Sequence, residues 1–210
     1  MTAKALPIAL LHLDESCLGN GKPGDNPGGA GGLVEVLGAK GVERRDFFIS
    51  SPSTTNNRMA LSGAIAALHL MGQKGNRLRL LVVSDSEYLV KGVREWAPAW
   101  ERRGWSRKGG PIENLELWRV LWDALDKHEA QFTWVRGHTG HAKNEYANDL
   151  AVAAATRQVT SDGIVVSGFA DWLAKKRAAG MYLEYDPDEA FSVMQRRLAA
   201  GELIPLAEGK

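Results

Sequence analysis

The sequence predicts an α/β fold in which a five-stranded mixed sheet carries helices on both faces. Three observations predict it. Three short apolar runs come early in the chain and are separated by Gly-rich turns, as in hairpin-linked antiparallel strands. Two later apolar runs, 78–83 and 131–136, alternate with amphipathic helical segments, which is typical of strands reached through helices. The length of 210 residues allows one domain with an appendage.

The first three strands are separated by segments rich in turn-forming residues. Pro7–Asp14 is an apolar run that ends in the acidic pair Asp14-Glu15. The next segment, Gly19–Gly32, is expected to be a wide turn, because it lacks the Gly-Lys-Ser/Thr ending of a phosphate-binding loop. The second and third strands are expected at Leu33–Leu37 and Arg44–Ser50, joined by a hairpin at 38–41.

A second acid follows the fourth predicted strand. Leu78–Val83 is strongly apolar, and Asp85 comes after it, directly before a helix expected from about Glu87 to Trp96. Asp85 has two interpretations, the N-cap of that helix or a partner of Asp14. If the first and fourth strands are neighbours, both carboxylates lie side by side. Further helices are expected at 58–71, 112–127 and 142–156.

Composition gives broad limits on location and partners. The formal net charge of +1 provides no general attraction to nucleic acid or membrane, so any basic surface must be local. The single cysteine, Cys17, excludes an internal disulfide and suits a reducing compartment. The sequence shows neither an apolar run of transmembrane length nor a secretory leader. We expect a cytoplasmic monomer that does not contact membranes.

Two further segments suggest a function, and the first of them also has a structural interpretation. Trp100 and Trp105 alternate with Arg102 and Arg103, a pattern that suits contact with a sugar–phosphate backbone. The same tryptophans can fill the core of a helical hairpin while the charges stay in water. The glycine-flanked His138 follows the last predicted strand, and this loop position suits an acid or base that works near neutral pH.

Several motifs occur together in a fixed order. They are Asp14-x-Ser16-Cys17-Leu18-Gly19-Asn20, Thr54–Met59, Ser84-Asp85-Ser86, the Trp/Arg segment, and Trp134–Glu145. With these motifs, the chain from about Leu6 to Thr156 resembles the type 1 ribonuclease H family. The resemblance implies a ribonuclease H-like domain at 1–156 and leaves 157–210 as a C-terminal extension.

The resemblance also implies a reaction. The family cuts the RNA strand of RNA–DNA hybrids with two divalent ions held by carboxylates, Mg²⁺ or alternatively Mn²⁺. It implies that Asp14 and Asp85 bind metal and that His138 assists proton transfer or product release. The residues that it assigns to binding the hybrid are Asn20, Thr55, Asn56, Asn57, Trp100, Arg102, Arg103 and Trp105.

Two of the four acids in the family pattern are missing from their expected positions. The first-helix position holds Ala60, and the last-helix position holds Asn148. Either both acids were deliberately replaced to trap a substrate, or Glu15 and Asp149 supply carboxylates from shifted positions. Neighbours on a strand point to opposite faces, and one helical step turns a side chain by about 100°, so each substitute requires a local change.

Three functions follow from this pattern. The leading one is a metal-dependent endonuclease acting on RNA–DNA hybrids. The second is a hybrid- or double-strand-binding protein that has lost catalysis, and the third is a different hydrolase or transferase on the same fold. The Asn56-Asn57 pair and the tryptophan segment argue against the third. The candidate catalytic residues are Asp14, Glu15, Asp85, His138 and Asp149, and the candidate metal ligands are Asp14, Glu15, Asp85, Asn148 and Asp149.

The C-terminal extension is expected to be helical and folded on the main domain. A polar linker is expected at 157–168. Phe169–Arg177 has the composition of a short helix, and Asp186–Ala200 begins with helix-starting residues and continues with apolar residues at helical spacing. A surface for a partner is the alternative role of this segment.

Overall fold

The computed structural model describes residues 5–19, 21–22, 24–137 and 139–204. Within these residues, six strands form one mixed sheet in the order β5-β4-β1-β2-β3-β6. Strands β1 (Ile8–Cys17), β2 (Gly28–Gly38) and β3 (Gly41–Ser51) are antiparallel neighbours. On its other side, β1 runs parallel to β4 (Arg79–Ser84), and β4 runs parallel to β5 (Glu129–Trp134). The mixed α/β sheet is confirmed, with a sixth strand added.

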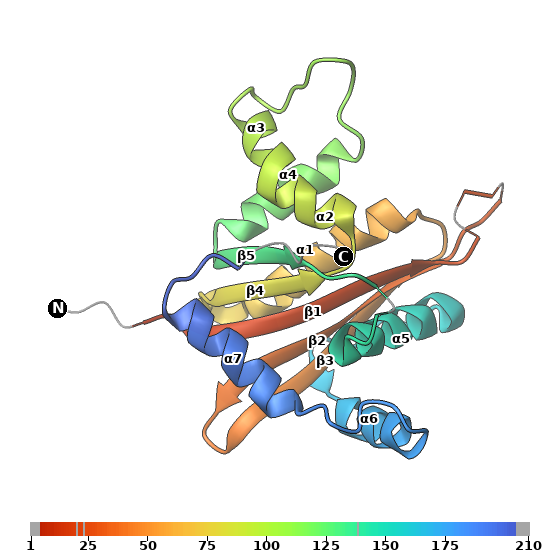
Figure 1. Ribbon diagram of the computed structural model, residues 1–210. Coiled ribbons are helices and arrows are strands. Elements are labelled where there is room, and N and C mark those ends of the chain that lie inside the picture. Colours follow the sequence, from red (N-terminus) through yellow and green to blue (C-terminus); the bar gives the residue numbers. More distant parts are fainter. Residues whose placement is uncertain (1–4, 20, 23, 138, 205–210) are drawn as a thin grey trace.

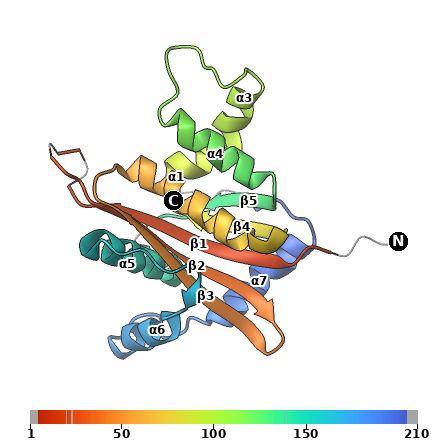
Figure 2. The ribbon, with the colours of Figure 1, turned by 180° about the vertical axis from the view of Figure 1, so that it is seen from behind.

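Helices cover both faces of the sheet, as Figure 1 and Figure 2 show. On one face lie α1 (Asn56–Met71), the short 3₁₀ turn η1 (Gln73–Gly75), and α4 (Leu115–Leu125). Between β4 and α4 the chain forms α2 (Glu87–Lys91), the π-helical segment η2 (Gly92–Trp96) and α3 (Ala97–Glu101). On the opposite face lie α5 (Ala142–Arg157), α6 (Phe169–Ala178) and α7 (Pro187–Ala199).

The glycine-rich segment 28–32 belongs to β2, which corrects the expected wide turn at Gly19–Gly32. Helix α5 crosses β2 so closely that a Cβ on Gly31 would lie 2.5 Å from the Leu150 Cβ. On the other face of β2, a Cβ on Gly32 would lie 2.2 Å from the Phe47 ring. Residues without side chains are needed here for packing rather than for turning. Because these glycines have no side chains, the start of α5 can reach β1.

Helices α2 to α4 form a protrusion, which stands at the top of Figure 1. Trp100 is 9% exposed and packs its ring against Trp118 at a centroid distance of 5.7 Å. Trp105 packs edge-on against a tryptophan of α4. The two rings therefore help to fill the core of the protrusion, as the structural interpretation predicts, and contact of Trp100 with nucleic acid stays a prediction. Arg102 and Arg103 lie beside them on the exposed surface.

The C-terminal extension folds back onto the sheet. Helix α7 buries Phe191 and Leu198 against side chains of β1 and β4, and α6 buries Phe169 against β2. The strand β6 (Val165–Val166) pairs with β3, so part of the expected linker at 157–168 is a strand. Both predicted helices occur within a few residues of their expected limits. No helix in the described part of the chain is long and apolar enough to cross a membrane.

Candidate active site

Two acids follow the paired parts of β1 and β4. The pairing of these parallel strands ends at Leu13 and Ser84, and Asp14 and Asp85 come next. Asp85 is not the cap of α2, because Ser86 occupies the N-cap position. The Asp85 carboxylate lies against Gly137, where a Cβ would be 2.2 Å from Oδ2. The strand order thus puts both acids at one edge of the sheet, beside the loop that follows β5.

Asp14 is buried and held by two hydrogen bonds. Its side chain belongs to a residue that is 5% exposed. The backbone N of Glu15 donates to Oδ1 at 2.7 Å, and Asn144 Nδ2 donates to Oδ2 at 3.1 Å. Burial, and after it the carboxylates of Asp85 and Glu15, raise the pKa of Asp14 to about 8. Such a shift is typical of an acid whose neighbours supply too little positive charge.

Glu15 reaches the same acids from the opposite face of β1. Strand β1 continues to Cys17, so Glu15 and Asp14 point to opposite faces. The Ser86 side chain is hydrogen-bonded to Glu15, and burial together with the charge of Asp85 raises the pKa of Glu15 to about 8. Its Oε2 atom is buried without a hydrogen-bond partner in the described part of the chain. Glu15 joins the cluster without a break in β1. Strand β4 ends at Ser84, and residues 85–86 continue beyond that end to meet the Glu15 side chain.

Ala60 lies across the β1–α1 interface from Glu15. Glu15 is paired with Ala30 of β2, and the Ala30 Cβ is 2.6 Å from where a Cβ on Gly63 would lie. Gly63 is about one helical turn from Ala60 on α1, and Ala60 is completely buried. The strand therefore sends a carboxylate into the region beneath α1 that the family pattern fills with an acid from the helix.

The two candidates on α5 have different surroundings. Asn148 lies one turn beyond Asn144, so both are on the helical face directed toward Asp14. Asp149 is half exposed, accepts a hydrogen bond from Trp172 Nε1 at 2.7 Å and lies 4.0 Å from Lys176 Nζ. One helical step turns Asp149 toward α6 and away from Asp14. The prediction that Asp149 joins the acid cluster is corrected for this reason.

The predicted substrate-binding residues at the start of α1 lie together. Thr55 is the N-cap of this helix, and its side-chain oxygen accepts a hydrogen bond from a backbone N–H of the first turn. Asn56 and Asn57 form the beginning of that turn. Two further candidates, Asn20 and His138, lie outside the described residues, so their positions stay predictions.

Sequence reasoning missed the residues that orient the acids. Asn144 is 2% exposed and bonds to Asp14, while Ser86 bonds to Glu15. Asn144 stood within the last family motif, but no role was assigned to it. Its spacing of four residues from Asn148 could have revealed it, because residues so spaced share a helical face.

Sequence reasoning also missed a second charged network, which lies on the face of the sheet opposite to α1. Glu35 is completely buried and accepts hydrogen bonds from Arg44 Nε at 2.9 Å and Lys143 Nζ at 2.7 Å. Burial acts to raise its pKa, but His12 and Lys143 outweigh burial and hold the pKa at about 2. Glu35 is the single acid in the predicted strand 33–37, and nothing in the sequence identifies the basic residues that pair with it. The network joins β1 and β2 to the start of α5.

The acid cluster fits a hard divalent cation. Asp14, Glu15 and Asp85 offer carboxylate oxygens, and burial, followed by repulsion from neighbouring carboxylates, raises the pKa values of the first two. Oxygen ligands are those that Mg²⁺ prefers, and it commonly keeps water and substrate oxygens beside one or two carboxylates. Among the described residues, no three acids, histidines or cysteines are grouped so that they could hold a metal ion by themselves, so a bound ion would need water or substrate oxygens beside these carboxylates.

We expect the metal-free protein to lose stability as the pH rises from about 5 to about 8. In this range Asp14 and Glu15 keep their protons in the folded chain but release them in the unfolded chain, where carboxyl pKa values are about 4. The folded state binds more protons, so the free energy of unfolding falls with rising pH. Thermal denaturation in EDTA at several pH values measures this slope. A Glu15→Gln variant should have a shallower slope, and an unchanged slope would contradict the assignment.

The mixed sheet and the acids gathered at its edge define a ribonuclease H-like α/β protein. The RNase H family model matches residues 8–156. Ribonuclease H from Methylococcus capsulatus is 37% identical over 159 residues, which cover 75% of this chain and 96% of that protein. Ribonuclease H from Stutzerimonas stutzeri is 40% identical over 152 residues, covering 70% and 93% respectively. The chain belongs to the ribonuclease H family, whose metal-dependent members hydrolyse the RNA strand of RNA–DNA hybrids.

Solved structures give the same family and extend the match. The crystal structure of LC9-RNase H1, described as a type 1 RNase H with the type 2 active-site motif, is 42% identical with a TM-score of 0.79. The match covers 100% of this chain and 99% of that one, so it includes the C-terminal extension. The foamy virus RNase H domain, at 17% identity and a TM-score of 0.61, shares the fold.

Proposed function

We propose that this chain is an active, metal-dependent endonuclease for the RNA strand of RNA–DNA hybrids, with a rearranged set of acids. The observation that carries the proposal is the meeting of Asp14, Glu15 and Asp85, two of which have pKa values raised to about 8. A protein that had lost catalysis would have no need to keep three mutually repelling acids together, one of them buried and two partly buried, because such an arrangement costs folding free energy.

The alternative of deliberate replacement is less well supported. Glu15 is not part of the usual type 1 pattern, and replacing acids to trap a substrate gives no reason to add it. LC9-RNase H1, a relative that is 42% identical, is described as a type 1 enzyme with the active-site motif of another type. We infer that Glu15 takes the place of the acid missing at Ala60, and that Asn148 is a native ligand.

Asp14, Glu15, Asp85 and Asn148 would hold two Mg²⁺ ions, with Mn²⁺ as an alternative. When bound, such a pair of ions activates the attacking water and stabilises the leaving oxygen. The chain's own residues prepare the site. Asn144 donates a hydrogen bond to Asp14 Oδ2 and so fixes that carboxylate, and a hydrogen bond with Ser86 fixes the carboxylate of Glu15. His138, one residue beyond Gly137, would carry a proton to or from the reacting groups.

Recognition of the hybrid would depend on its shape and on the 2′-hydroxyl of the RNA rather than on base sequence. Asn20, Asn56 and Asn57 would contact the minor groove, and Thr55 would contact a phosphate of the DNA strand at the start of α1. Arg102, Arg103 and the partly exposed Trp105 would grip the DNA backbone from the protrusion. Trp100 would support them from the core.

The remaining predictions concern the whole chain. We propose a ribonuclease H-like domain at 1–156 and a helical extension at 157–210, which is supported by the limits of the family match. We propose a cytoplasmic location, because the one cysteine is free and suits a reducing compartment. We also propose that the protein is a monomer. Size-exclusion chromatography with light scattering tests the monomer.

The test is cleavage of a labelled RNA–DNA hybrid by the full chain in Mg²⁺. We expect fragments of the RNA strand, and none from an Asp14→Asn variant. A gel-shift with that variant should still detect the hybrid complex. Binding by the unaltered chain without cleavage would support the second function, a hybrid-binding protein. In that case Ala60→Glu combined with Asn148→Asp should restore cleavage.

A further inference from the structure

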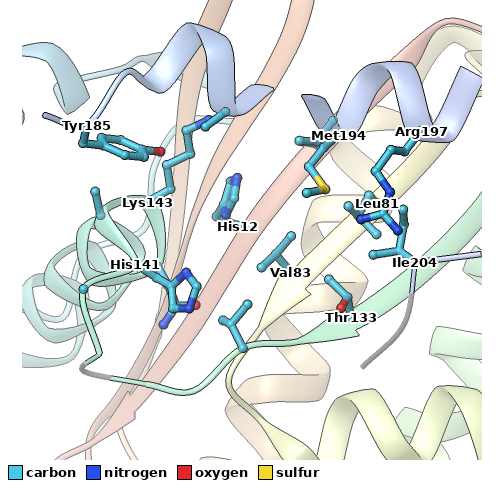
Figure 3. Close-up of a pocket in the computed structure, with 16 residues that line it drawn as sticks. His12, Leu81, Val83, Thr133, His141, Lys143, Tyr185, Met194, Arg197 and Ile204 are labelled. Atoms are coloured by element: carbon cyan, nitrogen blue, oxygen red, sulfur yellow. The ribbon is translucent and has the colours of Figure 1, made fainter. Parts of the chain in front are cut away.

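A cavity of about 360 Å³ lies between the sheet and α7, outside the acid cluster. Figure 3 shows the side chains that surround it. Strands β1, β4 and β5 form one wall, and α7 and the start of α5 form the others. Its volume falls in the range of about 300–1,000 Å³ that is usual for small-molecule sites. The nuclease mechanism proposed above makes no use of it.

One end of the cavity is mainly apolar. Leu81, Val83, Met194 and Ile204 line it, and Figure 3 shows Leu81 and Met194 on the same side as Ile204. Thr133 and Arg197 also lie on this side, and the guanidinium of Arg197 is paired with Glu202. The apolar side chains belong to β4, to α7 and to the segment after α7, so the wall is assembled by the extension folding back. Water gains little from such a wall, whereas an apolar ligand would bury both its own surface and that of the wall.

The other end of the cavity carries hydrogen-bond donors. Figure 3 places His12, His141, Lys143 and Tyr185 there, across the cavity from Met194. No aspartate or glutamate lines the cavity within the described ranges. Glu35 lies behind this end, completely buried, and its charge is already matched by its pairs with Lys143 and an arginine. The lining therefore favours a ligand group that accepts hydrogen bonds.

One buried polar atom at this end lacks a partner. Asn144 Oδ1 is inaccessible and has no hydrogen-bond partner in the described part of the chain, whereas His12 Nε2 lies 3.3 Å from Glu35 Oε2 and is engaged there. Both residues line the cavity, and Asn144 is only 2% exposed. A buried polar group without a partner costs free energy. A carboxylate only accepts hydrogen bonds, so a water molecule carried with the ligand would donate the bond that Asn144 Oδ1 lacks.

We propose that this cavity binds an amphiphilic monocarboxylate, with its aliphatic part against Leu81, Val83 and Met194. Its carboxylate lies among the donors of His141, Lys143 and Tyr185. The apolar end explains the aliphatic part, and the donor-lined end without acids explains the anionic head. The acids of the active site are not among the contacts, but Asn144, which holds Asp14, lines the same cavity, so the test below measures binding and not nuclease activity.

The test uses the full metal-free chain labelled with ¹³C at its methionine methyl groups. The methyl signal of Met194, assigned with Met194→Leu, is followed while octanoate is added. We expect the Met194 methyl signal to shift with octanoate concentration until the shift saturates. Ala190→Phe, which fills the cavity from α7, should abolish it, whereas Ala199→Phe on the exposed end of the same helix should not. The absence of a saturable shift in the unaltered chain would overturn the proposal.

A second arm tests the head group without relying on a core substitution. Octanol has the same chain without the charge, and we expect it to bind about tenfold more weakly, since it cannot form charge-assisted hydrogen bonds with these donors. His141→Gln should weaken octanoate binding and leave octanol binding unchanged. His69→Gln, an exposed histidine on α1, is the matched control and should change neither. Equal affinity for octanol and octanoate would overturn the carboxylate assignment.

Discussion

Glu15→Gln is expected to abolish Mg²⁺-dependent cleavage of the hybrid while making the metal-free protein more stable. The change removes a proposed metal ligand, and the loss should be about 100-fold or more, because even partners outside the ligand shell commonly contribute 10–100-fold. It also removes a buried acid whose pKa is raised to about 8 by burial and by Asp85. Each pKa unit corresponds to about 1.4 kcal/mol, so a gain of a few kcal/mol is expected at pH 8. Single-turnover cleavage and thermal denaturation in EDTA measure the two effects.

The matched control for this variant is Asp149→Asn. It makes the same change from acid to amide at the other candidate position, which the structure places beside Trp172 and Lys176. We expect near-normal cleavage and a small change in stability. If Asp149→Asn abolished cleavage and Glu15→Gln did not, the missing acid would come from α5, and the assignment of Glu15 would be wrong.

Phe191→Ala is expected to destabilise the whole protein, although residue 191 lies far outside the family match. Phe191 is completely buried and packs with Leu10, Leu81 and Leu198 beneath the sheet. Removing a buried phenylalanine side chain costs about 3–5 kcal/mol. For a chain of this size, that lowers the Tm by roughly 10 °C. Thermal unfolding followed by circular dichroism measures the shift.

Leu203→Ala provides the comparison for this second change. Leu203 also belongs to the extension but is 83% exposed. Its truncation should change stability by no more than about 0.5 kcal/mol. Equal behaviour of the two variants would mean that α7 is not packed on the sheet in solution. A large loss confined to Phe191→Ala would make the extension an integral part of the fold.

The sequence predicted the elements whose residues have a clear period or ending. The apolar parts of β1 and β4 are each followed by an acid, and the pairing of these strands brought Asp14 and Asp85 to one edge as expected. The glycines of β2 were assigned to a turn because local composition says nothing of a helix pressing on a strand. The two-residue strand β6 was missed for a similar reason, since it exists only through pairing with β3.

The residue types of the candidate site were predictable from the sequence, but the directions in which its side chains point were less so. The alternation of side chains along β1 suggested that Glu15 could act only if the strand had ended. The structure shows another solution, since the chain after β4 passes the strand end and meets side chains from both faces of β1. Asn144 and Ser86 were missed because hydrogen bonds between distant segments leave no periodic pattern. The same holds for the buried charge of Glu35.

The facing positions of Glu15 and Ala60 limit the order in which such a site can evolve. An ancestor with an acid at both positions would place two carboxylates in one closed region, which burial and repulsion disfavour. An ancestor with neither would lack a ligand. Each intermediate is thus less fit than the forms on either side of it, so the two substitutions are epistatic. Among relatives, an acid at the position of Glu15 should accompany a small residue at that of Ala60, and the reverse.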